Sequence, residues 1–368
     1  MNTKTISQLF SQTYAQSRQK FLAAAQSKGL TVDSFELAFK GAEGETLATD
    51  VVVEGPRDAS RMLIVISGVH GVEGFTGSAV QTGLLGMQLP IPDDTSVLYV
   101  HAINPFGFSH LRRVTQENVD LNRNFIDFNS DLPQNPGYEQ IHDALLPPAW
   151  PPERDDVLEN YRLEHGDKAL QQAMSIGQYK AEDGMWFGGR APTWSNDTFR
   201  EILRKYTADV DVLASIDIHT GLGPYGYGER IFAGFDHDIF KRAQGWWGEL
   251  TNVHTGTSTS VAMSGPIQAA IVQECASAQH IGICLEYGTY PFERVIAALR
   301  ADHWAHRYGM RMTAQGSAIA RHLKDTFYPD ELEWQLMIWE QAEQAVVQAL
   351  NGLAVLRQPE RQVTVNFN

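Results

Sequence analysis

The chain has 368 residues, and a hydrophobic content of 43% supplies enough apolar sequence for a large core. Its 44 acidic residues outnumber 29 basic ones, and the net charge of −15 argues against nucleic acids and anionic membrane surfaces as partners. Two cysteines, Cys275 and Cys284, are too few for a disulfide framework or a cysteine-based zinc site.

The N-terminal sequence carries polar side chains throughout and lacks the apolar centre of a signal peptide. No apolar run elsewhere reaches the roughly 18 residues that a membrane-spanning helix needs. We therefore expect a cytoplasmic protein.

The first third of the chain begins with a helical pattern and then changes to strands. Apolar residues at helical spacing predict a helix that ends near Ala25. Strand-like runs follow at 35–41, 47–55, 61–68 and 96–105. The first two flank the polar turn AEGE and predict a hairpin, and the last two are apolar throughout, as in strands buried on both faces. A helical pattern between the last two strands implies a parallel pairing.

Residues 129–195 are rich in proline and aspartate and predict an insertion over one edge of the sheet. Regular elements are then expected at 196–207, 211–221, 230–235, 238–250 and 281–291. Two helices, near 292–308 and 330–350, close the chain. The order of elements predicts one α/β domain with a mixed, largely parallel twisted sheet flanked by helices.

Polar residues follow the predicted strands, where an open α/β sheet places its ligand site. His70 and Glu73 follow one strand, His219 ends another, and Glu286 ends a third. Zinc catalysis uses three nitrogen or oxygen ligands, an open position and a nearby carboxylate, so these residues are candidates for such a site. Taken alone, His70 and Glu73 would better suit an ordinary glycine-rich loop, and the preceding strand and the glycines strengthen the ligand interpretation. Asp217 shares a strand face with His219, and either a supporting role or a core-edge carboxylate fits it.

Three other catalytic motifs find no support. The stretch GLGPYG (221–226) has dinucleotide-binding glycine spacing, but its proline and the following YGYG indicate a loop where a helix should begin. The nucleophile elbow Gly-x-Ser-x-Gly and the metalloprotease motif His-Glu-x-x-His are absent.

The segment HAINPFGFSHLRRVTQENVDLNRNF (101–125) resembles the signature of the carboxypeptidase A-like zinc metallopeptidases. This superfamily also includes succinylglutamate desuccinylase and aspartoacylase. The motifs GVHGVEG, DIHTG and CLEYG stand in the family's order on either side. The resemblance covers about 35–310 and implies one zinc carboxypeptidase-like catalytic domain, of phosphorylase/hydrolase-like fold, over 1–368. Within it, 129–195 is the insertion and 311–368 a C-terminal helical segment.

The resemblance implies that His70, Glu73 and His219 bind one zinc ion per chain. It makes Glu286 the general base, which takes a proton from water and passes it to the leaving amine. The residues themselves leave open whether a second metal binds.

Further roles follow from the same resemblance. Arg113 would polarise the scissile carbonyl, with Arg112 as the alternative one position away. Asp120 would accept a hydrogen bond from a zinc-bound histidine. Asn122 and Arg123 would bind the terminal carboxylate of the substrate, for which an arginine fork is suited.

The substrate is the open question. Classical carboxypeptidases place a tyrosine between the third ligand and the catalytic glutamate, but 231–285 contains none. Tyr225, Tyr227, Tyr287 and Tyr290 are the candidates to replace it. The small residues of HGVEG are closer to the desuccinylases and aspartoacylases, whereas NPFG and VDLNRNF are closer to the peptidases. We expect a zinc metallopeptidase that acts on a small peptide or acylated amino acid. The alternatives are an N-acyl amino acid deacylase and an inactive binding protein.

Overall fold

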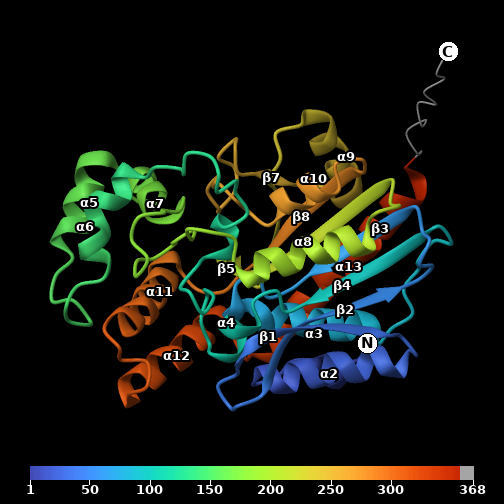
Figure 1. The fold of residues 1–368 in the computed structure, drawn as a ribbon, viewed down its shortest axis with the longest axis horizontal. Helices are drawn as coiled ribbons and strands as arrows, with labels where there is room; N and C mark the ends of the chain where they lie inside the picture. Colours follow the sequence, from blue (N-terminus) through green and yellow to red (C-terminus); the bar gives the residue numbers. More distant parts are fainter. Residues whose placement is uncertain (357–368) are drawn as a thin grey trace.

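A computed structural model describes residues 1–356 and contains one eight-stranded sheet (Figure 1). The strands are β1 (Val32–Lys40), β2 (Thr46–Glu54), β3 (Arg61–Ile66), β4 (Thr95–His101), β5 (Val212–Tyr225), β6 (Gly228–Phe232), β7 (Thr251–Asn252) and β8 (Gln279–Gly288). Their spatial order is β1-β2-β4-β3-β5-β8-β6-β7. The central strands β4, β3, β5 and β8 run parallel, whereas β1, β2 and β6 pair antiparallel with their neighbours on at least one side. The predicted hairpin and the mixed, largely parallel sheet are confirmed.

Helices cover both faces of the sheet. They are α1 (Thr3–Leu9), α2 (Tyr14–Ser27), α3 (Gly74–Leu85), α4 (Pro105–Ser109), α5 (Pro136–Leu145), α6 (Asp156–His165), α7 (Asp167–Ser175), α8 (Trp194–Tyr206), α9 (His237–Trp247), α10 (Gln268–Glu274), α11 (Phe292–Arg307), α12 (Ala314–Phe327) and α13 (Leu332–Val355). Two 3₁₀ turns, η1 (Gly71–Glu73) and η2 (Leu121–Arg123), complete the set. One apolar core joins one face of the sheet to α2, α3, α9 and α13, and a second joins the other face to α8 and α10.

The helices at the two ends of the chain differ from the prediction. The N-terminal pattern forms two helices, because Asn2 caps α1 and Thr13 caps α2 through their side-chain oxygens. The two predicted closing helices are present as α11 and α13, but the prediction missed α12, which lies between them. This helix begins at a Thr313 cap and packs Ile319, Leu323 and Phe327 against its neighbours. The last part of the predicted C-terminal segment, 357–368, lies outside the described residues.

The segment 129–195 carries α5, α6 and α7, which lie beside the sheet together with α11 and α12 (Figure 1). A third apolar cluster joins α5 and α7 to α11 and α12, with Trp186 among its members. No helix among the described residues is long and apolar enough to cross a bilayer.

The sheet brings the candidate site residues together at the carboxyl ends of its central strands. Strands β3, β5 and β8 are parallel neighbours, so their carboxyl ends lie together. His219 on β5 is the direct cross-strand partner of Glu286 on β8. The chain after β3 turns through η1 at these carboxyl ends and begins α3.

Candidate metal centre

A tight glycine turn presents His70 and Glu73 after β3. The backbone N–H of Gly71 donates to the carbonyl of Arg113 (3.0 Å), which ties the turn to the segment after α4. A Cβ on Gly71 would lie 2.1 Å from the backbone carbon of Gly107. Glycine is therefore required for this close approach of two backbones. This packing of the turn against α4 holds the His70 and Glu73 side chains at the carboxyl ends of the central strands.

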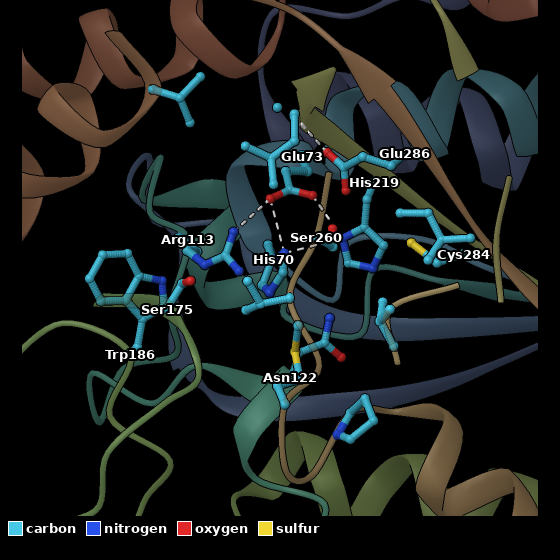
Figure 2. Close-up of a pocket in the computed structure, with 18 of the residues that line it drawn as sticks. His70, Glu73, Arg113, Asn122, Ser175, Trp186, His219, Ser260, Cys284 and Glu286 are labelled. Atoms are coloured by element: carbon cyan, nitrogen blue, oxygen red, sulfur yellow. Dashed lines mark hydrogen bonds and ion pairs between the residues drawn. The ribbon is translucent and has the colours of Figure 1, made fainter. Parts of the chain in front are cut away.

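Three buried side chains converge on one point (Figure 2). Nδ1 of His70 lies 2.9 Å from Oε1 of Glu73, and Nδ1 of His219 lies 2.8 Å from Oε2 of Glu73. The two Nδ1 atoms are 3.1 Å apart. One donor atom from each residue thus lies within 4.8 Å of the others, close enough for a shared metal ion.

The other ring nitrogens each face a carboxylate. Nε2 of His70 lies 3.3 Å from Asp120, and Nε2 of His219 lies 2.8 Å from Asp217. These carboxylates favour the proton on Nε2 and leave a lone pair on each Nδ1. When both Nδ1 atoms are unprotonated, two lone pairs and the Glu73 carboxylate face one buried point, whose negative potential a cation would neutralise. The donor set therefore fits a divalent metal ion.

Opposing charges set the pKa values in this cluster. Burial would raise the pKa of Glu73, but His70 and His219 hold it well below its usual range. Burial would lower the pKa of His219, but Asp217 and Glu73 hold it well above its usual range. Burial would raise the pKa of Asp120, yet Arg113 and other cations keep it low. Both acids are therefore ionised at neutral pH.

The pKa of Glu286 is raised, in contrast to the lowered pKa of Glu73. Burial and the neighbouring Glu73 raise its pKa to about 8. Its Oε1 accepts a hydrogen bond from the backbone N–H of Leu222 (2.9 Å), and its carboxylate faces the cavity that Glu73 also faces (Figure 2). A carboxyl group with a pKa near neutrality can both accept and return a proton.

The two adjacent arginines, Arg112 and Arg113, lie in different surroundings. Nε of Arg113 contacts Asp120 (3.0 Å), and its Nη1 contacts Glu73 (3.1 Å) at the cavity wall. Arg112 instead lies buried against Asp302 (3.0 Å) and Asn118 (3.0 Å). Arg113 is therefore the arginine that the structure places at the site.

Asn122 and Arg123 also line the cavity. Asn122 Oδ1 accepts a hydrogen bond from the backbone N–H of Ile267 (3.0 Å). Arg123 donates to Asp120 (3.2 Å) and to the carbonyl of Ser175, and its buried Nε has no partner within residues 1–356. Glu286, Arg113, Asn122 and Arg123 thus lie at the same cavity as the three candidate ligands, and their roles toward a substrate stay predictions.

None of the four candidate tyrosines lines the cavity among the described residues. Tyr287 is fully buried and donates to the carbonyl of Ile338, and Tyr225 donates to Glu331. The cavity, of about 140 Å³, has mainly apolar walls, including Trp186, Leu222, Met263, Phe292, Leu299 and Phe327. It continues into a cavity of about 1190 Å³ bounded by α6, α7, α11 and the chain after β7.

Two polar residues near the site carried no signal in the sequence. Gln268 lines the cavity and donates to Asp217 (3.3 Å). Glu229 on β6 is the cross-strand partner of Glu286. Each of the two residues lies near the site because of a partner distant in the chain, so local sequence patterns do not indicate its position.

Comparison with family models matches residues 10–341 to the family described as "Protein of unknown function (DUF2817)". The chain belongs to this family. None of the curated proteins matches it in sequence.

Among solved structures, the chain is similar to carboxypeptidase A from Helicoverpa armigera, with 14% identity over 86% of this chain and 74% of that one (TM-score 0.46). Bovine thrombin-activatable fibrinolysis inhibitor, solved with tick carboxypeptidase inhibitor, shares 11% identity over 93% and 97% (TM-score 0.47). An aspartoacylase family protein from Mesorhizobium loti shares 14% over 76% and 67% (TM-score 0.37).

Proposed function

We propose that this protein is a zinc-dependent hydrolase that cleaves an amide bond beside a free carboxylate. The observation that carries the proposal is the convergence of His70, Glu73 and His219 at a cavity that Arg113 and Glu286 also line. Two imidazoles and one carboxylate suit zinc and leave a fourth position open. When bound, the ion would polarise a carbonyl group and lower the pKa of water to about 7.

The chain's own groups supply the proton transfer and the positioning. Glu286 would take a proton from the attacking water and return it to the leaving amine. Arg113 uses Nε and Nη1 for Asp120 and Glu73, so the hydrogens on Nη2 remain for the substrate's carbonyl oxygen. Its positive charge would stabilise the oxygen charge that develops there.

The substrate's carboxylate would be bound by Asn122 and Arg123. Arg123 is buried, and in the part of the chain that the structure describes its Nε has no partner, so this donor is available to an anionic group that enters the cavity. We propose a small peptide with a free C-terminus as the substrate.

Deacylation of an N-acyl amino acid is the second candidate. It is favoured by the lack of tyrosine among the described cavity residues and by the small inner cavity of about 140 Å³. Both candidates use the same reaction and differ in what lies beyond the cleaved bond.

The test combines metal binding with a substrate screen. Wild-type protein should bind about one zinc per chain, as a three-ligand site predicts. His219→Gln should lose that zinc, whereas His237→Gln, at an exposed position at the start of α9, should keep it. Peptides with free C-termini and N-acyl amino acids are then compared as substrates. A chain with no affinity for zinc contradicts the proposal, and a zinc-bound chain inactive on both classes identifies a binding protein.

A further inference from the structure

Glu229 is a buried carboxylate outside the candidate metal-ligand set. Its side chain lies on β6, and the residue is only 3% exposed. In the described part of the chain, its hydrogen-bond partners are neutral: the Thr251 hydroxyl (2.5 Å), the Thr259 backbone N–H (3.1 Å) and the Thr259 hydroxyl. A buried carboxylate is tolerated when hydrogen bonds to its oxygens replace those lost from water.

The sheet register places Glu229 beside the proposed general base. Glu286 pairs with His219 on one side and with Glu229 on the other. Directly paired residues project from the same face of a sheet, so the three form one row across β5, β8 and β6. The Glu229 carboxylate nevertheless bonds to the chain that follows β7.

That chain, residues 253–263, is here called the wall segment. The cavity at the candidate metal centre is here called the metal cavity. The wall segment lines it with Val253, His254, Ser260, Val261 and Met263. All of these except Met263 also line the larger cavity, so the wall segment lies where the two meet. Gln171 on α7 donates to the Thr259 carbonyl (3.3 Å) from the opposite side.

The wall segment cannot leave β6 without removing hydrogen bonds from Glu229. We propose that Glu229 is a positioning residue that holds the wall segment against the sheet and thereby determines how tightly the metal cavity binds substrate. This inference rests on the proposed function for its substrate, but the position of the wall segment can be measured without any reaction.

The kinetic test uses Glu229→Gln, which keeps the side-chain size but turns an NH₂ group toward donors. We expect KM to rise about tenfold or more, the effect of losing a hydrogen bond to a charged group, with kcat and zinc content nearly unchanged. Thr259→Val should raise KM less, and the double variant should be less than additive because both changes remove the same contact. The control is Glu249→Gln, at an exposed position after α9, with wild-type kinetics expected. A loss of kcat in Glu229→Gln with no change in KM would overturn the proposal.

Backbone hydrogen exchange provides the second readout. Glu229→Gln should speed exchange of the Thr259 amide and its neighbours about tenfold or more, while amides of α3 keep their wild-type rates. Unchanged exchange in the wall segment overturns the proposal, whatever the kinetics show. If Glu229→Gln does not fold, Thr259→Val carries the same exchange test. A wild-type protein inactive on both substrate classes would contradict the proposed function, and the exchange result would still decide whether Glu229 holds the wall segment.

Discussion

Asp217 is a buried carboxylate behind the candidate metal ligand His219. Its Oδ2 lies 2.8 Å from Nε2 of His219, and its Oδ1 is buried with no hydrogen-bond partner among the described residues. The negative charge keeps the proton on Nε2, raises the basicity of Nδ1 and fixes the ring. Asp120 contacts His70 in the same manner, although it also contacts two arginines.

We predict that Asp217→Asn lowers zinc affinity about 10- to 100-fold, the range expected for a carboxylate behind a histidine ligand. Asparagine retains an acceptor for His219 but lacks the charge. Competition with a chelator of known affinity measures the change, and the control is Asp209→Asn at an exposed position before β5. Equal zinc affinities of Asp217→Asn and wild type would assign Asp217 a purely structural role.

Glu286→Gln separates metal binding from proton transfer. Glutamine can still accept the hydrogen bond from Leu222, but it cannot take a proton from water. We expect a full complement of zinc and a loss of about 10²- to 10⁴-fold in kcat. Glu340→Gln, at an exposed position of α13, should retain wild-type turnover. Turnover of Glu286→Gln near the wild-type rate would show that another group is the base.

The sequence predicts the strand-end residues of the site better than their surroundings. His70, His219 and Glu286 follow continuous apolar runs, and the end of such a run is a local signal. Whether Arg112 or Arg113 faces the site depends on the path of the irregular chain after α4. Glu229 bonds to a threonine 30 residues later, and no periodicity indicates that pairing.

At the scale of elements, the turn between β3 and α3 is the most constrained. Its Gly71 N–H donates to the Arg113 carbonyl after α4, and the Cα of Gly71 packs against the backbone of α4 itself. Helix α3 is buried along its whole length, so it cannot shift to relieve a clash. The position of the His70 and Glu73 side chains therefore depends on a residue that carries no side chain.

We predict that Gly71→Ala destabilises the fold by about 1–3 kcal/mol, the typical cost of overpacking, and weakens zinc binding. Gly245→Ala is the matched control, since its Cβ in α9 would meet nothing within 4 Å. That change should stabilise the protein by about 0.4–1 kcal/mol through the unfolded state. Urea unfolding measures both variants, and a neutral Gly71→Ala would show that the two backbones can separate.

Most of the long elements were predicted, whereas α12 and the short helices α4 and α10 were not. Strands β3 and β4 are buried at every position, which explains the apolar runs at their centres. Helices α4 and α10 are brief, so tertiary contacts define them more than periodicity does. The residues of α12 that pack in the third apolar cluster are Ile319, Leu323 and Phe327.

For the molecule as a whole, the segment 129–195 shapes the cavity. Trp186 and Ser175, which belong to 129–195, line the metal cavity opposite the wall segment. The sequence predicted an insertion from its proline content, but composition says nothing about which surface an insertion covers. Its apolar contacts with α11 determine that position.

The core also encloses histidines that are neutral in the folded state. His101, at the end of β4, is fully buried, stacks on Phe21 at 4.4 Å and bonds Ser78 through Nε2 (2.9 Å). Burial lowers the pKa of His101 to about 4, although Asp50 opposes the shift. Burial likewise lowers the pKa of His303 on α11 to about 3. Both are near 6.5 in an unfolded chain, so acid favours unfolding.

We therefore predict that the free energy of unfolding falls as the pH drops from about 6.5 toward 4. The unfolded chain binds the proton first, so stability is fully present above pH 6.5 and is lost at up to about 1.4 kcal/mol per pH unit for each such histidine. His101→Gln, which can still bond Ser78, should show a smaller loss than wild type, whereas His237→Gln on the surface should follow wild type. Urea titrations at pH 7, 6 and 5 with a chelator measure this without a contribution from metal release. Parallel losses in wild type and His101→Gln would mean that His101 is protonated inside the fold.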